Sequence, residues 1–239
     1  MSLELEKRVE WIKETVKGAG AKGLVFGLSG GIDSAVVGGL AMLAFPETSL
    51  GLIMPCESLD EDEEDALLVA KAIGLPTEKV DLTNTYRELI KASFDSEHKM
   101  AKANIKPRLR MTTLYYYAQS LNRLVAGGSN KSELYLGYYT KHGDSGVDML
   151  LISDLVKEEV FELAQELNIP KKIIDKKPSA GLWKGQTDED EMGFRYKDID
   201  GFLRGEDVPE EALKKIERLH NISHHKRSMA PMFKGTWED

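Results

Sequence analysis

The segment from Leu24 to Leu43 constrains the fold of this chain more than any other part of the sequence. It begins with the apolar run Leu24-Val25-Phe26, which is typical of a buried parallel strand. A turn of glycine and serine follows, and then small apolar residues that are typical of a helix. Glycines let the main chain pass tightly around an anion, and a helix start offers unpaired N–H groups. This order of strand, turn and helix predicts a phosphate-binding loop.

Asp33 adds a carboxylate to the predicted phosphate-binding loop. A carboxylate beside bound phosphates is most easily tolerated when a divalent cation lies between the two. The loop therefore predicts a metal ligand at Asp33 as well as a phosphate site.

Three other motifs overlap this region and are weaker. A Walker A loop ends in Gly-Lys-Ser/Thr, and no lysine stands here. The G-x-G-x-x-G pattern over residues 18–23 precedes the strand, whereas a dinucleotide fingerprint follows one. Residues 27–31 fit the G-x-S-x-G nucleophile elbow, which needs an oxyanion loop from an earlier strand. Only the helical segment 3–17 lies upstream, so a serine hydrolase is the weaker alternative.

Strand-like and helix-like segments alternate along the rest of the chain. Apolar runs predict strands at 24–26, 49–54, 79–82, 124–126 and 150–152, and helical patterns lie at 3–17, 59–73, 83–93, 111–124 and 153–167. This order predicts an α/β fold with a doubly wound, mostly parallel sheet and helices on both faces. The 239 residues suffice for one sizeable core, and no linker or repeat indicates a second domain.

Charge, apolar run length and cysteine content exclude several classes of partner. The net charge of −8 argues against broad, nonspecific binding of nucleic acid. No apolar run is long enough to span a membrane, so neither nucleic acid nor membrane is an expected partner. Cys56 is the single cysteine, which excludes an intrachain disulfide and fits a reducing cytoplasm. We interpret Cys56 as a small apolar core residue.

A second glycine turn, Gly127-Gly128, follows another predicted strand. Because the carboxyl ends of parallel strands meet at one edge of a sheet, both glycine turns should open onto the same side. Glu133 comes just after the second turn. It is either a second metal-binding carboxylate beside Asp33 or a solvated glutamate favoured by a helix dipole. The acidic run from Asp60 to Asp65 is interpreted as a solvated helix start.

Two further segments have the composition of binding loops. Residues 137–148 mix glycines, aromatic residues and charges, which suits close approach and stacking. Residues 104–110 place three cations just before a predicted helix, where an arginine can fork onto a phosphate. An ordinary surface loop and an exposed basic turn explain the two segments about equally well.

The motifs GLSGGIDS, NIKPRLRM, GSNKSE, GYYTKHGD, DLVKEEV, KPSAGLW, GQTDEDEMG and HHKR occur in this order. With them the chain resembles the ammonia-dependent NAD synthetases, within the larger group of pyrophosphate-loop ATP enzymes. The first motif alone would indicate only the larger group. The resemblance implies an adenine nucleotide α-hydrolase-like fold, with residues 1–239 as a single synthetase domain and no glutaminase domain.

The resemblance implies a carbon–nitrogen ligase that completes NAD biosynthesis in two steps. The nicotinate carboxylate of deamido-NAD attacks the α-phosphate of ATP, which gives an acyl adenylate and pyrophosphate. Ammonia then displaces AMP and forms the amide of NAD. The resemblance further implies Mg²⁺ on Asp33 and Glu133 and a homodimer with shared active sites. Because the chain has no room for a glutaminase domain, free ammonia is the expected donor.

The resemblance also implies a role for each matching residue. Asp144 is implied to receive ammonium and take up its proton, and Lys157 to steady the α-phosphate. The implied ATP ligands are Gly27, Leu28, Ser29, Gly30, Gly31, Ile32, Asp33, Ser34, Lys157 and Ser179. The implied deamido-NAD ligands are Arg108, Lys141, Asp148, His225 and Lys226. Of these, His225 and Lys226 are expected to reach the dinucleotide of the partner subunit.

Some features leave room for other interpretations. Gly128 stands where relatives carry threonine, so a side-chain contact to ATP is expected to be lost. The Tyr115-Tyr116-Tyr117 cluster is expected at the subunit interface, on a helix buried on more than one side. The histidines lack an H-E-x-x-H pattern, which disfavours a zinc site. Two other function classes stay open: an enzyme that adenylates a nucleotide base or tRNA, and a non-catalytic nucleotide-binding module.

Overall fold

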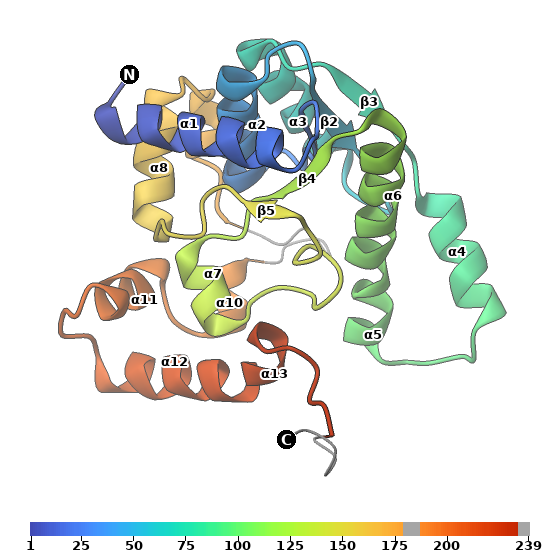
Figure 1. Cartoon of the computed structure of the whole chain (residues 1–239). Coiled ribbons are helices and arrows are strands. Elements are labelled where there is room, and N and C mark those ends of the chain that lie inside the picture. The colour runs from blue at the N-terminus through green and yellow to red at the C-terminus, as the bar shows by residue number, and fades with distance from the viewer. Residues whose placement is uncertain (179–186, 234–239) are drawn as a thin grey trace, which may run out of the picture.

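A parallel sheet of five strands organises the chain (Figure 1). The structure, a computed structural model, describes residues 1–178 and 187–233. The strands are β1 (Leu24–Gly27), β2 (Ser49–Ile53), β3 (Thr77–Lys79), β4 (Leu124–Gly127) and β5 (Met149–Leu150). They lie in the order β3-β2-β1-β4-β5, and each neighbouring pair is parallel. The order reverses between β1 and β4, which is where such sheets bind ligands beyond the carboxyl ends of their strands.

Helices cover both faces of the sheet. Side chains alternate along a strand, so one strand can contribute to the core on both faces. In β1, Leu24 and Phe26 join one core cluster, and Val25 joins another. The first cluster packs α1 (Leu3–Gly18), α2 (Ile32–Ala44), α3 (Asp60–Ile73), α8 (Lys157–Glu166) and α9 (Lys171–Ile174). The second packs α4 (Thr83–Ala92) and α6 (Ile105–Leu121), which α5 (Lys99–Ala103) precedes. The predicted doubly wound α/β fold is confirmed.

A third core cluster joins α7 to the helices of the C-terminal part of the chain (Figure 1). It unites α7 (Lys131–Leu136) with α10 (Asp188–Met192), α11 (Tyr196–Leu203) and α12 (Glu210–Ile222), and α13 (His224–Arg227) follows. Leu136 of α7 and Ile199 of α11 are buried within it. This cluster brings the C-terminal part of the chain toward the segment that follows β4.

Several elements differ from the sequence prediction at their ends. α6 begins at Ile105 and not at Met111, so the basic segment 104–110 lies within the helix. Pro107 is tolerated there because it falls in the first turn, where N–H groups have no partner in the helix. β3 ends at Lys79, where the predicted strand begins. α8 begins at Lys157, four residues later than expected.

The N-terminal helix is fastened to the connection between β5 and α8. Arg8 donates hydrogen bonds to the carbonyl oxygen of Leu151 at 2.9 Å and to both carboxylate oxygens of Asp154 at 2.7 Å. Cys56 is buried in the second core cluster, in line with its interpretation as an apolar core residue. Among the residues described, no helix has the length and apolar character needed to cross a membrane.

Candidate active site

A cavity of about 1200 Å³ lies at the carboxyl ends of β1 and β4. The turns after both strands line it, as the sequence predicted for two parallel strands that end at one edge. Its other walls come from α6, from residues 136–147 and from α13. A concave site of this size can hold a nucleotide.

The phosphate-binding loop is shaped by Gly30. This residue has a φ of +79°, and a Cβ on it would lie 2.6 Å from the carbonyl oxygen of Asp62 and 2.8 Å from the Cβ of Asp65. Only glycine fits, because α3 packs directly against the loop. Of the eight predicted loop residues, Gly30 and Ser34 are the two that do not line the cavity.

The start of α2 is open to an anion. Gly31 is the N-cap residue and gives the helix no side-chain hydrogen bond, so the first N–H groups are left for a ligand. The hydroxyl of Ser34 instead donates to the carbonyl oxygen of Gly31 at 2.9 Å. The hydroxyl of Ser29 lies 3.0 Å from that of Ser34, and no histidine is among its partners in the described residues. The nucleophile-elbow alternative therefore lacks its base.

Asp33, Glu133 and Lys157 meet at the floor of the cavity, from α2, α7 and α8. The Nζ of Lys157 lies 2.5 Å from Oδ2 of Asp33 and 3.8 Å from Oε1 of Glu133. Asn130 donates to the other oxygen of Asp33 at 3.0 Å and caps α7 through the backbone N–H of Glu133. The Glu133 side chain is only 16% exposed. Of its two interpretations, the solvated glutamate is wrong.

Carboxyl groups outnumber ammonium groups in this cluster. Burial, together with repulsion from Asp33, raises the pKa of Glu133 to about 8. Burial alone would lower the pKa of Lys157, but attraction to Asp33 and Glu133 outweighs it and raises the pKa. Burial also raises the pKa of Asp188 nearby. The floor of the cavity therefore favours an additional cation.

The sequence analysis assigned no role to a set of side chains around Lys157. The Nζ of Lys157 lies 5.1 Å from the centre of the Tyr196 ring, a cation–π contact. Asp188 is buried and accepts hydrogen bonds from the hydroxyls of Tyr196 at 2.9 Å and Tyr138 at 3.2 Å. These tyrosines fix the carboxylate beside the cluster. Only the motif GQTDEDEMG, which contains Asp188, could have drawn attention to it.

The loop after α7 brings together four of the five residues assigned to deamido-NAD. Arg108 donates to the carbonyl oxygen of Lys141 at 3.1 Å, and the Nζ of Lys141 donates to the carbonyl oxygen of His225 at 2.6 Å. Lys226 donates to the carbonyl oxygens of Gly137 and Tyr139. Arg108, Lys141, His225 and Lys226 all line the cavity of their own chain. The expectation that His225 and Lys226 reach the dinucleotide of a partner subunit stays a prediction.

Asp144 lies in the same loop and faces the cavity. One of its carboxylate oxygens accepts a hydrogen bond from the backbone N–H of Thr140 at 2.9 Å. The protein atoms around the cavity desolvate this carboxylate and raise its pKa, although the residue is exposed to the cavity. The hydrogen bond from Thr140 opposes the shift. A raised pKa makes the carboxylate a better proton acceptor.

Asp148 lies apart from this group and is not among the residues that line the cavity. Its carboxylate accepts hydrogen bonds from the backbone N–H of Val125 at 2.8 Å and from the hydroxyl of Tyr115 at 3.1 Å. Tyr116, next in α6, is 71% exposed, so within this chain the helix is covered on one side only. The expectation that Tyr115–Tyr117 pack against a second subunit stays a prediction.

The acidic run at the start of α3 is not simply solvated, and that interpretation is wrong for Asp65. This residue is fully buried, and its carboxylate contacts the Nζ of Lys172 at 2.6 Å and that of Lys176 at 2.7 Å. Asp62 contacts Lys176 at 3.0 Å. The ion pairs fasten the cavity wall at Lys176 to the helix that shapes the phosphate loop. Ser179, a predicted ATP ligand, lies outside the described residues.

Comparison with known proteins identifies the family behind this geometry. The profile of the NAD synthase family matches residues 4–230. The chain belongs to the NAD synthase family.

Individual relatives cover nearly the whole chain. The NH(3)-dependent NAD(+) synthetase of Carboxydothermus hydrogenoformans is 53% identical over 226 residues, 93% of each chain. Among solved structures, the NMN synthetase of Francisella tularensis has a TM-score of 0.94 and 42% identity, with 97% of each chain covered. The NH3-dependent NAD synthetase of Campylobacter jejuni, in complex with the nitrate ion, has a TM-score of 0.82 and 31% identity. It covers 98% of this chain and 100% of its own.

Gly128, where the sequence analysis expected a lost side-chain contact to ATP, lies on the cavity wall beside Asp33. A Cβ there would lie 3.3 Å from Cγ2 of Val37 and 3.5 Å from the backbone of Asp33. A larger side chain fits only if Val37 shifts by a few tenths of an ångström. Glycine therefore lets the turn after β4 approach α2 closely in this member of the family.

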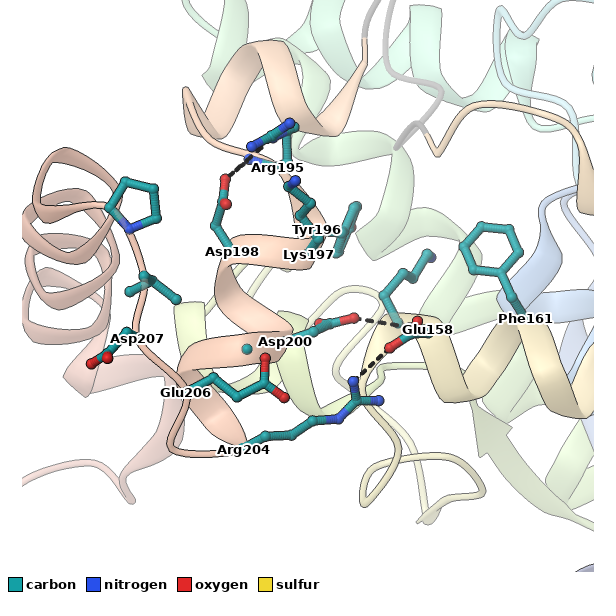
Figure 2. A pocket seen from close by; sticks show the side chains of 14 residues that line it. Glu158, Phe161, Arg195, Tyr196, Lys197, Asp198, Asp200, Arg204, Glu206 and Asp207 are labelled. Carbon is teal, nitrogen blue, oxygen red and sulfur yellow. Dashed lines mark hydrogen bonds and ion pairs between the residues drawn. The ribbon is translucent and has the colours of Figure 1, made fainter.

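A second cavity of about 580 Å³ lies behind Lys157, between the start of α8 and α11 (Figure 2). Charged side chains line it, and several are paired with one another. Arg204 donates to Glu158 at 2.5 Å, and Asp198 caps the start of α11 through the backbone N–H of Arg195. Lys157 lines both cavities, so the two cavities adjoin at this residue.

Proposed function

We propose that the large cavity is where this ammonia-dependent NAD synthetase adenylates deamido-NAD with ATP and then amidates it. The observation that carries the proposal is the meeting of an uncapped helix start with the Asp33–Glu133–Lys157 cluster. The helix N–H groups suit a pyrophosphate leaving group, and the cluster lies where negative charge must be balanced. We further propose that residues 1–239 act as one synthetase domain in the cytoplasm.

The residues of the cluster fit a divalent metal. Carboxylate oxygens are the ligands that Mg²⁺ prefers, and it commonly takes one or two of them with phosphates and water. The described residues hold no group of three or more acidic, histidine or cysteine side chains with metal-site geometry. Asp33 and Glu133 would therefore hold Mg²⁺ together with ATP. When bound, the ion neutralises charge that develops as the α–β phosphate bond breaks.

Lys157 supplies the movable cation of the site in this proposal. In the structure its ammonium contacts Asp33, which leaves it close to the start of α2. With ATP and a divalent metal at the two carboxylates, the ammonium of Lys157 would be free to contact the α-phosphate. The ring of Tyr196, 5.1 Å from the Nζ, gives the ammonium a further favourable contact.

Asp144 is proposed to take the proton from ammonium in the second step. Ammonium cannot attack the acyl adenylate until it loses a proton, so a carboxylate facing the cavity has a defined task. The raised pKa of Asp144 suits it to accept that proton. The displaced AMP leaves with the bonding electron pair of the acyl–oxygen bond.

The dinucleotide is proposed to bind the basic side of the cavity. Arg108, Lys141, His225 and Lys226 gather there, and cations suit the pyrophosphate of deamido-NAD. Asp148 would act from outside this cavity, which is compatible with a site completed by a second copy of the chain. A homodimer with shared sites is therefore part of the proposal.

Product analysis tests the reaction directly. The protein is incubated with ATP, Mg²⁺, deamido-NAD and ammonium, and the products are identified by mass spectrometry. NAD, AMP and pyrophosphate in equal amounts are expected. ATP binding without AMP release would refute the proposal and favour a non-catalytic nucleotide-binding module.

A second candidate acceptor is the smaller nicotinate mononucleotide. The observation that favours it is the TM-score of 0.94 to the NMN synthetase of Francisella tularensis. The same chemistry would then give the amide of the mononucleotide. Measuring kcat/KM for both acceptors decides between them, and we expect deamido-NAD to be preferred.

A further inference from the structure

Asp200 is a buried carboxylate to which the roles above assign no task. It lies in α11 and is only 3% exposed. One oxygen accepts a hydrogen bond from the hydroxyl of Ser132 at 2.6 Å, and the other accepts from the backbone N–H of Glu158 at 2.9 Å. Figure 2 shows Asp200 pointing at the start of α8, where a dashed line joins it to Glu158.

Both partners of Asp200 are sequence neighbours of site residues. Ser132 precedes Glu133 in α7, and Glu158 follows Lys157 at the start of α8. The N-cap residue of α8 is a valine, which offers no side-chain hydrogen bond. Asp200 therefore satisfies one of the first N–H groups of α8 from another helix. A single carboxylate fixes the start of α8 against α7.

We propose that Asp200 is a positioning residue for the adenylation step. By joining α7 to α8 it fixes the helix starts that carry Glu133 and Lys157 relative to each other, with Oε1 and Nζ 3.8 Å apart in this structure. The inference rests on the roles proposed above for these two residues. Asp200 needs to accept or donate two hydrogen bonds in fixed directions, and its charge is not required.

The adenylation step can be measured alone. Exchange of labelled pyrophosphate into ATP, with deamido-NAD and without ammonium, reports the first step only. A misplacement of about 1 Å in a catalytic site costs on the order of 10²-fold in rate. Asp200→Ala is therefore expected to slow the exchange by roughly that factor. The KM for deamido-NAD should change little, because its proposed ligands lie elsewhere in the cavity.

Asp200→Asn separates position from charge. Its amide oxygen can accept from the Glu158 N–H, and its amide N–H₂ can donate to the Ser132 hydroxyl. The exchange rate should therefore stay near that of the wild type. An exchange rate as low as that of Asp200→Ala would overturn the positioning role.

Glu159→Ala is the matched control. The carboxylate of Glu159 accepts from the backbone N–H of Val156 at 2.9 Å, so it caps the same helix start from within α8. Its loss should leave the exchange rate near that of the wild type. A loss equal to that of Asp200→Ala would mean that any weakening of this helix end has the same effect, and would refute the inference.

Ser132→Ala removes only the α7 half of the bridge. It should slow the exchange by less than Asp200→Ala, and the double variant should be no slower than Asp200→Ala alone. If circular dichroism finds Asp200→Ala unfolded, Ser132→Ala carries the test. A wild-type exchange rate in Ser132→Ala, or in folded Asp200→Ala, overturns the inference. Unchanged exchange in Asp33→Ala would instead refute the proposed function itself.

Discussion

The fit of Gly30 against α3 gives a prediction whose magnitude follows from the structure. In Gly30→Ala the new Cβ would have to occupy a position 2.6 Å from the carbonyl oxygen of Asp62. The left-handed backbone costs a non-glycine residue about 1–2 kcal/mol, and overpacking adds about 1–3 kcal/mol. The free energy of unfolding should therefore fall by roughly 2–5 kcal/mol.

Gly20→Ala is the control that isolates the contact. Gly20 has a φ of +68°, close to that of Gly30, but a Cβ there would meet nothing within 4 Å. Both variants carry the same cost of a left-handed backbone. The free energy of unfolding should therefore fall by about 1–3 kcal/mol more in Gly30→Ala, which is the cost of displacing α3 from the loop. Urea unfolding measures it, and pyrophosphate exchange should fall in Gly30→Ala only. Equal stabilities, or full exchange in a folded Gly30→Ala, would refute the packing argument.

Three further variants probe the site. Asp33→Ala should abolish pyrophosphate exchange at any magnesium concentration and leave the circular dichroism spectrum unchanged. Asp144→Asn should spare exchange and slow NAD formation by about 10²-fold on general-base grounds. Because desolvation raises the pKa of Asp144, NAD formation in the wild type should rise with pH as this carboxyl loses its proton, and the variant should lack that rise. Burial raises the pKa of Asp65, but hydrogen bonds from Lys172 and Lys176 outweigh it and lower the pKa overall. The stability that these contacts contribute is present above the unfolded aspartate pKa of about 4 and is lost as the pH falls further. Asp65→Ala should remove this pH-dependent part of the free energy of unfolding. The loss should be smaller than the ~3–5 kcal/mol of a fully buried ion pair, because both lysines reach solvent.

The central strands and the phosphate loop could be predicted because local chemistry decides them. Every residue from Leu24 to Phe26 is apolar, so both faces of this strand are apolar. This pattern is typical of a parallel strand covered on both faces. The glycine turn between this strand and a helix is typical of an anion-binding site. The start of α6 could not be placed in the same way, because Pro107 is compatible with both a turn and a first helical turn.

Tertiary contacts decide the remaining part of the site. Nothing in the acidic run at α3 distinguishes Asp65 from its solvated neighbours, since its burial depends on lysines more than 100 positions later. Asp188 and Asp200 likewise become important only when α10 and α11 fold against α7. Glu133 had two interpretations: the low exposure of its side chain excludes the solvated one, and its role as a metal ligand stays a prediction.

The contact between Arg8 and the connection after β5 has a practical consequence. A fluorophore, bead or fused partner attached to α1 would pull on the stretch of chain that ends at Lys157. Biosensor designs based on this protein should therefore anchor it elsewhere, for example on the outer surface of α4, where a load stays away from Lys157.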